Sequence, residues 1–335
     1  MYHTRFKGNH YEIGLRWGSL LAKHGNYILE HIPFPITEDR IQFAKQCLPV
    51  YQEYFPQILE EIQGISDGQS CSMDQLQAVI LSMYAMPPAC CCSCFAVSNG
   101  THVLFGRNSD FLTELEKDNM NVIYRFSSGS YAFTGNTTAF VQIEDGINEK
   151  GLAVGLTSVY PPSIKPGMNA GLLLRFFLEK CQSTEEVIQW VEKLPISSAQ
   201  TFTVADSHGD IAVLECCADS VQIIRPTKEQ PYVCATNLFH SAELASRNHL
   251  GIDSWEAEPR YQTMIHTLEF KASQMGLQDA KDLLAGKNGF LCQYDRRTGK
   301  DTVWSIVYDL KNHRIYRVEG NPSRRKYRED FRFPF

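Results

Sequence analysis

The stretch that most constrains this chain is residues 92–111, CSCFAVSNGTHVLFGRNSDF, because it has the pattern of a β-hairpin. An apolar run at residues 94–97 precedes a turn at residues 98–101, and a second apolar run follows at residues 103–105. The turn contains Asn-Gly, which is among the stronger short-range hairpin signals when it stands between two β-prone runs. The sequence therefore predicts two antiparallel strands whose far ends lie close together.

The predicted hairpin brings a thiol beside charged side chains. Cys92 stands at its start, and Arg107 and Asp110 stand near its end. A guanidinium near a thiol favours the thiolate, and a carboxylate can hold an ammonium group in place. We therefore interpret Cys92 as a candidate nucleophile with Arg107 and Asp110 as its charged neighbours.

Composition and charge exclude several function classes. The chain has 335 residues, of which 43% are hydrophobic and 21% charged, as in an ordinary soluble globular protein. The formal net charge is −6 and the basic run at residues 324–326 is short, so nucleic acid is not an expected partner. No run approaches the roughly 18 apolar residues of a membrane helix, and the start lacks the pattern of a secretory signal. We expect no membrane partner and a cytoplasmic location.

The eleven cysteines raise the question of disulfides or a metal. An odd count without an export signal favours reduced thiols, most of them small core residues. Zinc sites commonly use two ligand pairs separated by a loop, and the cluster of Cys90, Cys91, Cys92 and Cys94 has no second pair at such a spacing. We predict no metal and no cofactor, and a redox-sensing thiol cluster stays open as an alternative. The cysteines expected in the core are Cys47, Cys181, Cys216, Cys217, Cys234 and Cys292.

The first 91 residues predict a short strand followed mainly by helices. Apolar residues recur at helical spacing in two stretches, and Pro56 predicts two helices or a kink in the second. Ser72 can cap a further helix that runs to Met83. Two prolines then end that helix, and residues 89–91 deliver an extended chain to the hairpin.

The rest of the chain alternates blocks of strands and helices. Predicted strands lie at residues 122–126, 131–134, 139–143, 152–159, 201–205, 211–216, 221–225, 232–235, 302–309 and 313–318. Predicted helices lie at residues 170–194, divided by a cap at 183–186, and near 241–285, and residues 145–151 are predicted as a turn. This order favours two packed sheets flanked by helices. Without a repeat or a low-complexity linker, we expect one domain, residues 1–335.

Cys-Ser-x-Phe, the hairpin, and then Gly-Arg-Asn-x-Asp-Phe together resemble the N-terminal-nucleophile hydrolases of the choloylglycine hydrolase and penicillin acyl-transferase group, which includes linear amide C–N hydrolases. The resemblance implies an α+β fold, a four-layer αββα sandwich of two mainly antiparallel sheets. It also implies that the precursor cuts itself between Cys91 and Cys92. Residues 1–91 would then form a helical N-terminal segment and residues 92–335 the catalytic segment, with the new amine of Cys92 as general base.

The same resemblance extends to residues far from the hairpin. Arg107 and Asp110 fall on the family's hairpin arginine and aspartate. Asn237, in a Thr-Asn pair, falls on a side chain that donates to the oxyanion, although an asparagine there could also cap a helix starting near Ser241. Arg260 falls on a second arginine beside the nucleophile, with a surface salt bridge as the alternative.

A backbone donor to the oxyanion is also implied by the resemblance. The segment at residues 145–154 is similar to the one that precedes this donor in the family. By position the donor would be the amide of Thr157 or Ser158.

The sequence thus predicts a cysteine-nucleophile hydrolase of linear amides, or an acyl-transferase, that acts through an acyl-cysteine intermediate on a small N-acyl substrate. An acyl-CoA is a further candidate substrate, and a homo-oligomer is one candidate assembly. Two other classes stay open: a catalytically silent relative that binds acylated ligands, and a Cys-His thiol protease. The histidines considered for such a pair are His102, His208, His240, His249 and His266.

Overall fold

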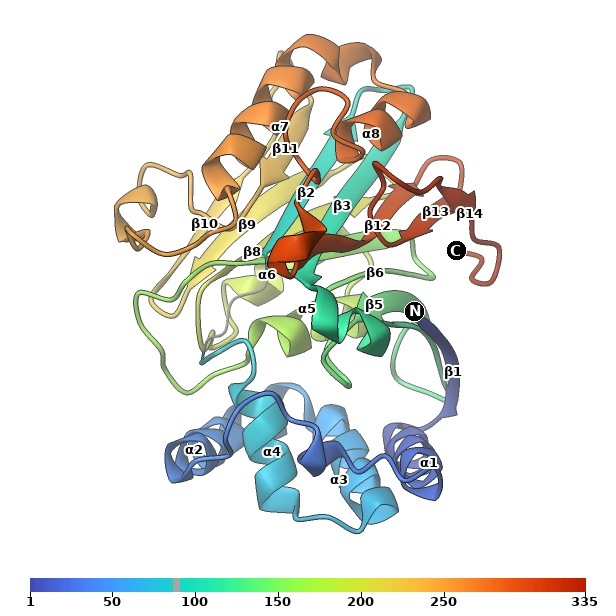
Figure 1. Cartoon of the computed structure of the whole chain (residues 1–335), viewed down its shortest axis with the longest axis vertical. Coiled ribbons are helices and arrows are strands. Elements are labelled where there is room, and N and C mark those ends of the chain that lie inside the picture. Colours follow the sequence, from blue (N-terminus) through green and yellow to red (C-terminus); the bar gives the residue numbers. More distant parts are fainter. Residues whose placement is uncertain (87–90) are drawn as a thin grey trace.

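Two β-sheets packed face to face form the centre of the molecule, with helices on both outer sides (Figure 1). The structure is a computed structural model and describes residues 1–86 and 91–335. Strand pairing is antiparallel throughout the described sheets except between β1 and β4, which run parallel. The expected α+β fold is confirmed.

The larger sheet has eight strands and the smaller has six. In spatial order the larger sheet contains β1 (Tyr2–Gly8), β4 (Met120–Phe126), β5 (Phe133–Thr137), β6 (Asp145–Asn148), β7 (Leu152–Ser158), β8 (Gln200–Asp206), β9 (Ile211–Cys217) and β10 (Ser220–Ile224). The smaller contains β11 (Tyr232–Ala235), β2 (Cys91–Ser98), β3 (Val103–Leu112), β12 (Lys300–Asp309), β13 (Arg314–Glu319) and β14 (Arg328–Glu329).

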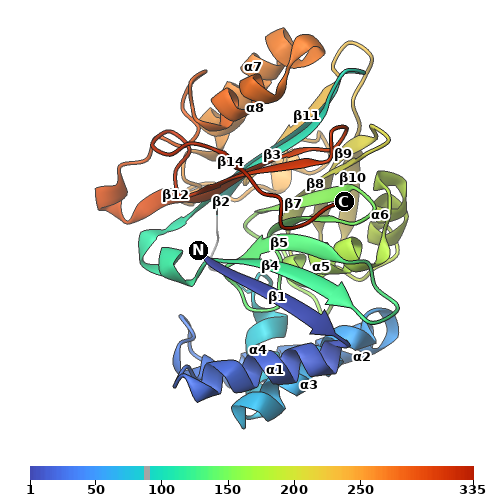
Figure 2. The ribbon, with the colours of Figure 1, turned by 90° about the vertical axis from the view of Figure 1, so that its right-hand side faces the viewer.

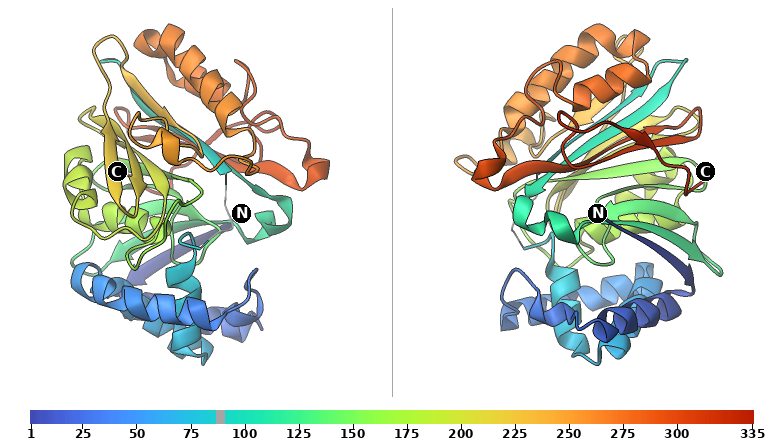
Figure 3. Two further views of the ribbon diagram at one scale, coloured as in Figure 1. Left: turned by 90° about the vertical axis from the view of Figure 1, so that its left-hand side faces the viewer. Right: turned by 45° about the vertical axis from the view of Figure 1, so that its right-hand side comes forward.

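The helices cover the outer faces of the two sheets (Figures 1 and 3). The N-terminal group contains α1 (His10–Lys23), α2 (Glu38–Tyr54), α3 (Pro56–Gln69) and α4 (Met73–Ser82). The later helices are α5 (Ala170–Lys180), α6 (Thr184–Val191), α7 (Ala257–Lys271) and α8 (Leu277–Leu284). Helices α5 and α6 contact the eight-stranded sheet, and α7 and α8 contact the six-stranded sheet. None of the described helices is long and apolar enough to cross a membrane.

Among the described residues, three of the hydrophobic cores lie between the layers, as expected for a four-layer αββα sandwich. The first joins the eight-stranded sheet to α1–α6 and includes Leu156 and Phe176. The second fills the space between the sheets and includes Phe105. The third joins the six-stranded sheet to α7 and α8 and includes Leu268 and Leu284. The turned view in Figure 2 shows the same sequence of layers.

Side-chain alternation in β2 decides which way the thiols face. Cys94 and Ala96 belong to the core between the sheets, whereas Phe95 and Val97 belong to the core under α7 and α8. Since successive strand residues point to opposite faces, Cys92 shares the face of Cys94 and points toward the eight-stranded sheet.

Several predicted elements are confirmed by the structure. Pro56 begins α3 directly after α2, at a first-turn position where the missing N–H of proline costs no intrahelical hydrogen bond. Ser72 caps α4 and Ser183 caps α6 through side-chain oxygens. The six cysteines assigned to the core are buried. Of the segment predicted to lead into the hairpin, residues 89–91, only Cys91 is among the described residues, and the two prolines predicted to end the preceding helix also lie outside them.

Three predictions are wrong. Residues 139–143 form bends rather than a strand, and Phe140 there has a φ of 61°. Residues 145–151, predicted as a turn, instead begin with the strand β6. This strand forms because its polar side chains find buried partners. The helix expected from residue 241 is absent, because the chain between that residue and the start of α7 forms only a single 3-10 turn. Asn237 therefore caps no helix there.

The N-terminal helices are joined to the body by a buried ion pair. Arg175 on α5 binds Glu61 on α3 through two of its nitrogens, and its Nε donates to Glu179 at 2.8 Å. The Arg175 and Glu61 side chains are 0% and 1% exposed. In addition, β1 pairs with β4, so the chain's first strand forms an edge of the larger sheet.

We predict that Glu61→Gln lowers the free energy of unfolding by about 3 kcal/mol, because a buried guanidinium loses one of its charged partners. Urea unfolding monitored by circular dichroism measures the change. Asp74→Asn is the matched control, because the Lys45–Asp74 pair is 48% and 60% exposed, and it should cost less than about 0.5 kcal/mol. Equal losses in the two variants would contradict this account.

Candidate active site

The hairpin of β2 and β3 carries the candidate nucleophile. Its register opposes Cys91 to Asp110, Cys92 to Ser109 and Cys94 to Arg107, and Gly100 in the turn has a φ of 81°. The polar residues expected at the far end of the hairpin lie within β3. Opposed residues of a sheet share a face, so Arg107 lies on the side of the Cys92 thiol and Asp110 on the other.

Arg107 places a positive charge against the thiol of Cys92. Its Nη2 donates to the Sγ of Cys92 at 2.8 Å, and its Nε donates to the carbonyl of Leu156 at 3.0 Å. Its Nη1 donates to Asp145 at 2.8 Å, and Glu144 lies 3.6 Å from Nη2. Burial opposes the charge of Arg107, yet the nearby thiol and carboxylates raise its pKa. A permanently charged donor is therefore fixed against the sulfur.

The thiols of Cys91 and Cys94 have a different environment from that of Cys92. Burial raises the pKa of Cys94 to about 12 and raises the pKa of Cys91 further, so both remain protonated near neutral pH. Cys91 donates to the carbonyl of Ser254 at 3.7 Å. Among these three thiols, Cys92 is the one that accepts a guanidinium hydrogen bond, which favours it as the reactive sulfur.

The space beside Arg107 depends on a glycine. A Cβ on Gly155 of β7 would lie 2.7 Å from Phe105 and 3.0 Å from both the Arg107 Cδ and the Cys94 Sγ. Only a residue without a side chain leaves room for the guanidinium stem under the hairpin.

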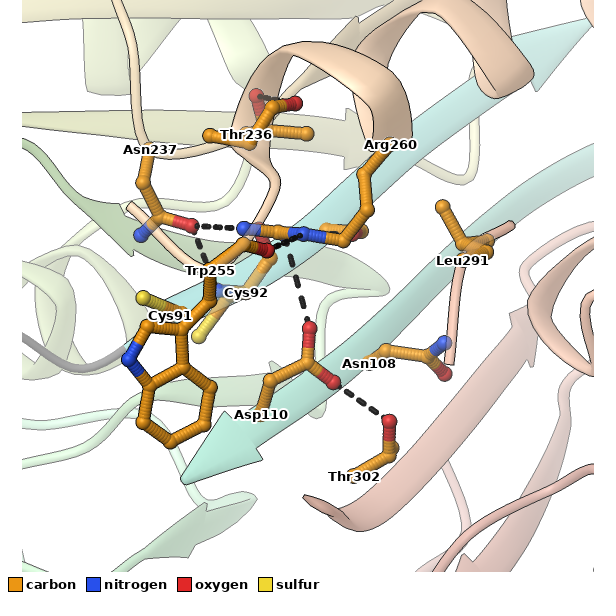
Figure 4. Close-up of polar contacts among 12 residues, drawn as sticks. Cys91, Cys92, Asn108, Asp110, Thr236, Asn237, Trp255, Arg260, Leu291 and Thr302 are labelled. Atoms are coloured by element: carbon orange, nitrogen blue, oxygen red, sulfur yellow. Dashed lines mark hydrogen bonds and ion pairs between the residues drawn. The ribbon is translucent and has the colours of Figure 1, made fainter. Parts of the chain in front are cut away.

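Asn237 contacts the backbone of the nucleophile (Figure 4). Its Oδ1 accepts from the backbone nitrogen of Cys92 at 2.9 Å, and its Nδ2 donates to the carbonyl of Ser158 at 2.8 Å. It follows β11, which pairs with β2, so the sheet holds it beside the start of β2. The preceding Thr236 anchors the turn, because its hydroxyl donates to the carbonyl of Ala257 at 3.1 Å.

Arg260, in the first turn of α7, contacts the same backbone. Its Nη1 donates to the Cys92 carbonyl at 2.6 Å and to the Ser93 hydroxyl at 2.9 Å, and its Nη2 donates to Asn237 at 2.9 Å. The side chain is fully buried. The surface salt bridge considered for Arg260 is therefore wrong.

Asp110 lies on the α7 side of the hairpin. It accepts a hydrogen bond from Thr302 at 2.6 Å, and Arg260 Nη1 stands 3.6 Å away (Figure 4). It also accepts from the Tyr294 hydroxyl at 3.1 Å. Burial raises the pKa of Asp110 to about 6, and Arg260 only partly offsets this because its hydrogen bonds go to other acceptors.

The two candidate backbone donors lie on β7 beside Asn237. The Val159 amide donates to Ala199 on the β8 side, at 3.2 Å. Amides alternate along an antiparallel strand, so the amide of Thr157 also points toward β8, whereas Ser158 points to the opposite edge. The hydroxyl of Thr157 donates to the carbonyl of Thr236 at 2.6 Å.

A small pocket opens next to this cluster. Apolar groups from Val159, Leu238 and Ile252 form part of its wall, and Cys91 and Asn237 also line it. The remaining lining residues are Ser158, Tyr160, Asn248, His249, Asp253 and Ser254.

The histidines considered for a Cys-His pair have other environments. His102 and His208 lie in turns, and His266 packs edge-on against Phe270. His240 stacks on Tyr261 with ring centroids 3.4 Å apart, and His249, in the pocket wall, packs against Tyr160. Within the described residues, no cluster of three or more His, Cys, Asp or Glu side chains suited to a metal is present.

Sequence reasoning missed the residues that hold the predicted ones in place. Asp145 binds Arg107 and also accepts from Trp304 Nε1 at 2.7 Å and from the Tyr308 hydroxyl at 3.3 Å. Tyr294 belongs with them, since it supports Asp110. A buried arginine implies a carboxylate partner, but the sequence gives no signal for which carboxylate it meets.

Comparisons with known proteins identify the family of the chain. The family model for acyl-coenzyme A:6-aminopenicillanic acid acyl-transferase matches residues 97–324, well over half of the 335-residue chain. The match begins after Cys92 and includes the positions of Arg107, Asp110, Asn237 and Arg260.

The solved structures of similar fold include two variants of a conjugated bile acid hydrolase. A mutant of conjugated bile acid hydrolase from Clostridium perfringens has a TM-score of 0.52 at 13% identity, covering 71% of this chain and 92% of that one. A second variant of that enzyme has a TM-score of 0.51 at 13% identity, with coverages of 72% and 97%. An N-acylethanolamine-hydrolyzing acid amidase ortholog from Caenorhabditis elegans has a TM-score of 0.49 at 15% identity, with coverages of 65% and 93%.

The fold is therefore that of the N-terminal-nucleophile hydrolases, as the sequence resemblance implied. Within this class the chain belongs to the acyl-coenzyme A:6-aminopenicillanic acid acyl-transferase family.

The raised pKa of Asp110 predicts how stability depends on pH. The folded state holds a proton up to about pH 6, whereas an ordinary aspartate loses it near 3.8. The folded state thus binds more protons in this range, so this carboxyl makes the protein less stable as pH rises from about 4 to 6, by up to about 3 kcal/mol. Asp110→Asn should abolish this contribution, as measured by urea unfolding at pH 4 and pH 6.5.

The exposed carboxylate of Asp74 provides the control, since Asp74→Asn should keep the wild-type pH dependence. The same pH dependence in wild type and Asp110→Asn would show that the Asp110 carboxyl is not held protonated.

Proposed function

We propose that this protein is a cysteine-nucleophile amide hydrolase or acyl-transferase that acts on small N-acyl substrates through an acyl-cysteine intermediate. The main support is the position of Cys92: its sulfur accepts from Arg107 at 2.8 Å while its backbone nitrogen donates to Asn237 at 2.9 Å. The nucleophile and its nearest base would thus belong to one residue. Residues 1–335 act as one domain in this proposal.

The reaction requires a maturation step. Cys91 and Cys92 are consecutive residues of β2, so the nitrogen of Cys92 is that of a peptide bond. In the proposed step, the Cys92 sulfur attacks the Cys91 carbonyl carbon, the C–N bond breaks as the nitrogen takes a proton, and a thioester forms. Water then hydrolyses the thioester, which leaves a carboxylate on Cys91 and an amine on Cys92. The products are residues 1–91 and 92–335.

The freed amine serves as the general base. An α-amine has an ordinary pKa of about 7.7–8.0, so it can accept the thiol proton near neutral pH. Arg107 favours the thiolate, and Arg260 adds positive charge on the other side of the strand. Asp110 is proposed to position the protonated amine, since a carboxylate can hold an ammonium group in place.

Two donors are proposed for the oxyanion that forms when the sulfur attacks the substrate carbonyl. The first is the Asn237 carboxamide, whose Nδ2 already points along the edge of β7. Of the two backbone candidates we favour Ser158 over Thr157, because the Thr157 amide points into the β7–β8 pairing. Aligned donors of this kind stabilise the developing negative charge.

Water or an amine then releases the acyl group. The apolar wall of the pocket, formed by Val159, Leu238 and Ile252, supports an apolar acyl group on the substrate. Hydrolysis and acyl transfer, including transfer from an acyl-CoA, differ only in the acceptor or donor that enters this pocket. We favour hydrolysis of a linear amide.

The maturation step predicts a chain break. Mass spectrometry of the purified protein should find fragments ending at Cys91 and beginning at Cys92, and Cys92→Ser should slow or abolish the break because a hydroxyl is a weaker nucleophile than a thiolate. Cys94→Ser, on the same strand and face, is the matched control and should leave the break in place. Full amidase activity in an intact wild-type chain would refute the step.

Turnover tests the function itself. Wild type should hydrolyse members of a panel of N-acyl amino acids, penicillins and bile-salt conjugates, assayed with and without an acceptor amine. Asn237→Ala should lower kcat by about 10²–10³-fold, the usual cost of losing an oxyanion donor. Ligand binding without turnover, together with a Cys92 that resists iodoacetamide, would instead indicate a silent acyl-binding relative. Reversible disulfides among the clustered cysteines would indicate a redox protein.

A further inference from the structure

Tyr294 reaches the site from a part of the chain that sequence reasoning left without a role. It lies in the segment between α8 and β12, and its hydroxyl donates to Asp110 Oδ2 at 3.1 Å. The ring is held by edge-on packing against Trp255, at 5.9 Å between centroids, and Phe290, at 5.4 Å. Two aromatic neighbours thus fix the direction of the hydroxyl.

The same hydroxyl lies 3.3 Å from the carbonyl oxygen of Trp255, which also accepts from Arg260 Nε at 3.0 Å. Trp255 and the next residue, Glu256, have φ values of 52° and 58°, a left-handed conformation that is unfavourable for both. Such a turn persists only where its surroundings hold it. Tyr294 therefore contacts both the Asp110 carboxylate and the strained turn that begins α7.

The charge on Asp110 is set by groups from several elements. Arg260 of α7 faces it at 3.6 Å, and Thr302 of β12 donates to its other oxygen at 2.6 Å. Asp110 also interacts electrostatically with Arg107 of β3, Cys91 of β2, and Cys292 and Tyr294 of the segment before β12. Since Arg260 is not at hydrogen-bond distance, the neutral donors Tyr294 and Thr302 orient the carboxylate.

We propose that Tyr294 is a positioning residue of the reaction: its hydroxyl holds the Asp110 carboxylate in the orientation and charge state that receive the amine of Cys92. This role rests on the proposed function. When Asp110 is ionised, the Tyr294 hydroxyl donates its single proton to that carboxylate. When Asp110 is protonated, the hydroxyl can accept from it and donate to the Trp255 carbonyl. Tyr294 thus couples the protonation of Asp110 to the turn beside the nucleophile.

Tyr294→Phe tests the proposal, because it removes the hydroxyl and keeps the ring packing. The acid limb of the kcat profile should move upward by about half to one pH unit, since the carboxylate loses one donor. At pH 7 kcat should fall about tenfold while KM stays within about twofold, because Tyr294 does not line the pocket.

A second readout needs no turnover. The loss of stability that accompanies ionisation of Asp110, measured by urea unfolding between pH 4 and 7.5, should have a higher midpoint in Tyr294→Phe than in wild type. Tyr327→Phe is the matched control, because its hydroxyl pairs with Ser305 at 2.6 Å away from Asp110, and it should leave both profiles unshifted.

The outcomes separate this proposal from the function on which it rests. If Tyr294→Phe shifts the stability midpoint but the wild-type protein shows no turnover, the Tyr294–Asp110 coupling is supported and the amidase proposal is contradicted. An active enzyme in which Tyr294→Phe and Tyr327→Phe give the same pH profiles overturns the role of Tyr294.

Discussion

The site depends on one buried guanidinium. Arg107 lies between the two sheets, with the sulfur of Cys92 at 2.8 Å on one side and the carboxylate of Asp145 at 2.8 Å on the other. A charge in that position would be very costly if it were unpaired, and Asp145 compensates it. The six-stranded sheet supplies the arginine and the eight-stranded sheet its counter-ion, so the packing of the two sheets brings this charge pair together beside the thiol.

The other half of the site lies on the opposite face of the hairpin. Arg260 and Asn237 both bind the backbone of Cys92, and Asp110 stands behind them with Tyr294 and Thr302. The two arginines therefore act on different parts of one residue, the sulfur and the peptide group. This division suits a chemistry in which the same residue supplies a nucleophile and, after a chain break, a base.

The N-terminal segment is part of the folded body rather than an appendage. Strand β1 extends the eight-stranded sheet, and Glu61 neutralises Arg175 on α5. Both contacts are noncovalent. A break before Cys92 would thus leave residues 1–91 attached through a sheet edge and a buried ion pair.

The sequence by itself determined the hairpin, the helices capped by Ser72 and Ser183, the break at Pro56 and, by resemblance, residues that meet around Cys92, because these depend on local patterns. It misplaced β6 and missed Asp145, Tyr294 and Trp255, because their roles come from partners distant in the chain. Asp110 and Tyr294 are 184 positions apart, and Cys92 and Arg260 are 168 apart. Only the tertiary structure decides such pairs, since a buried charge or hydroxyl takes whichever partner the packed sheets bring within reach.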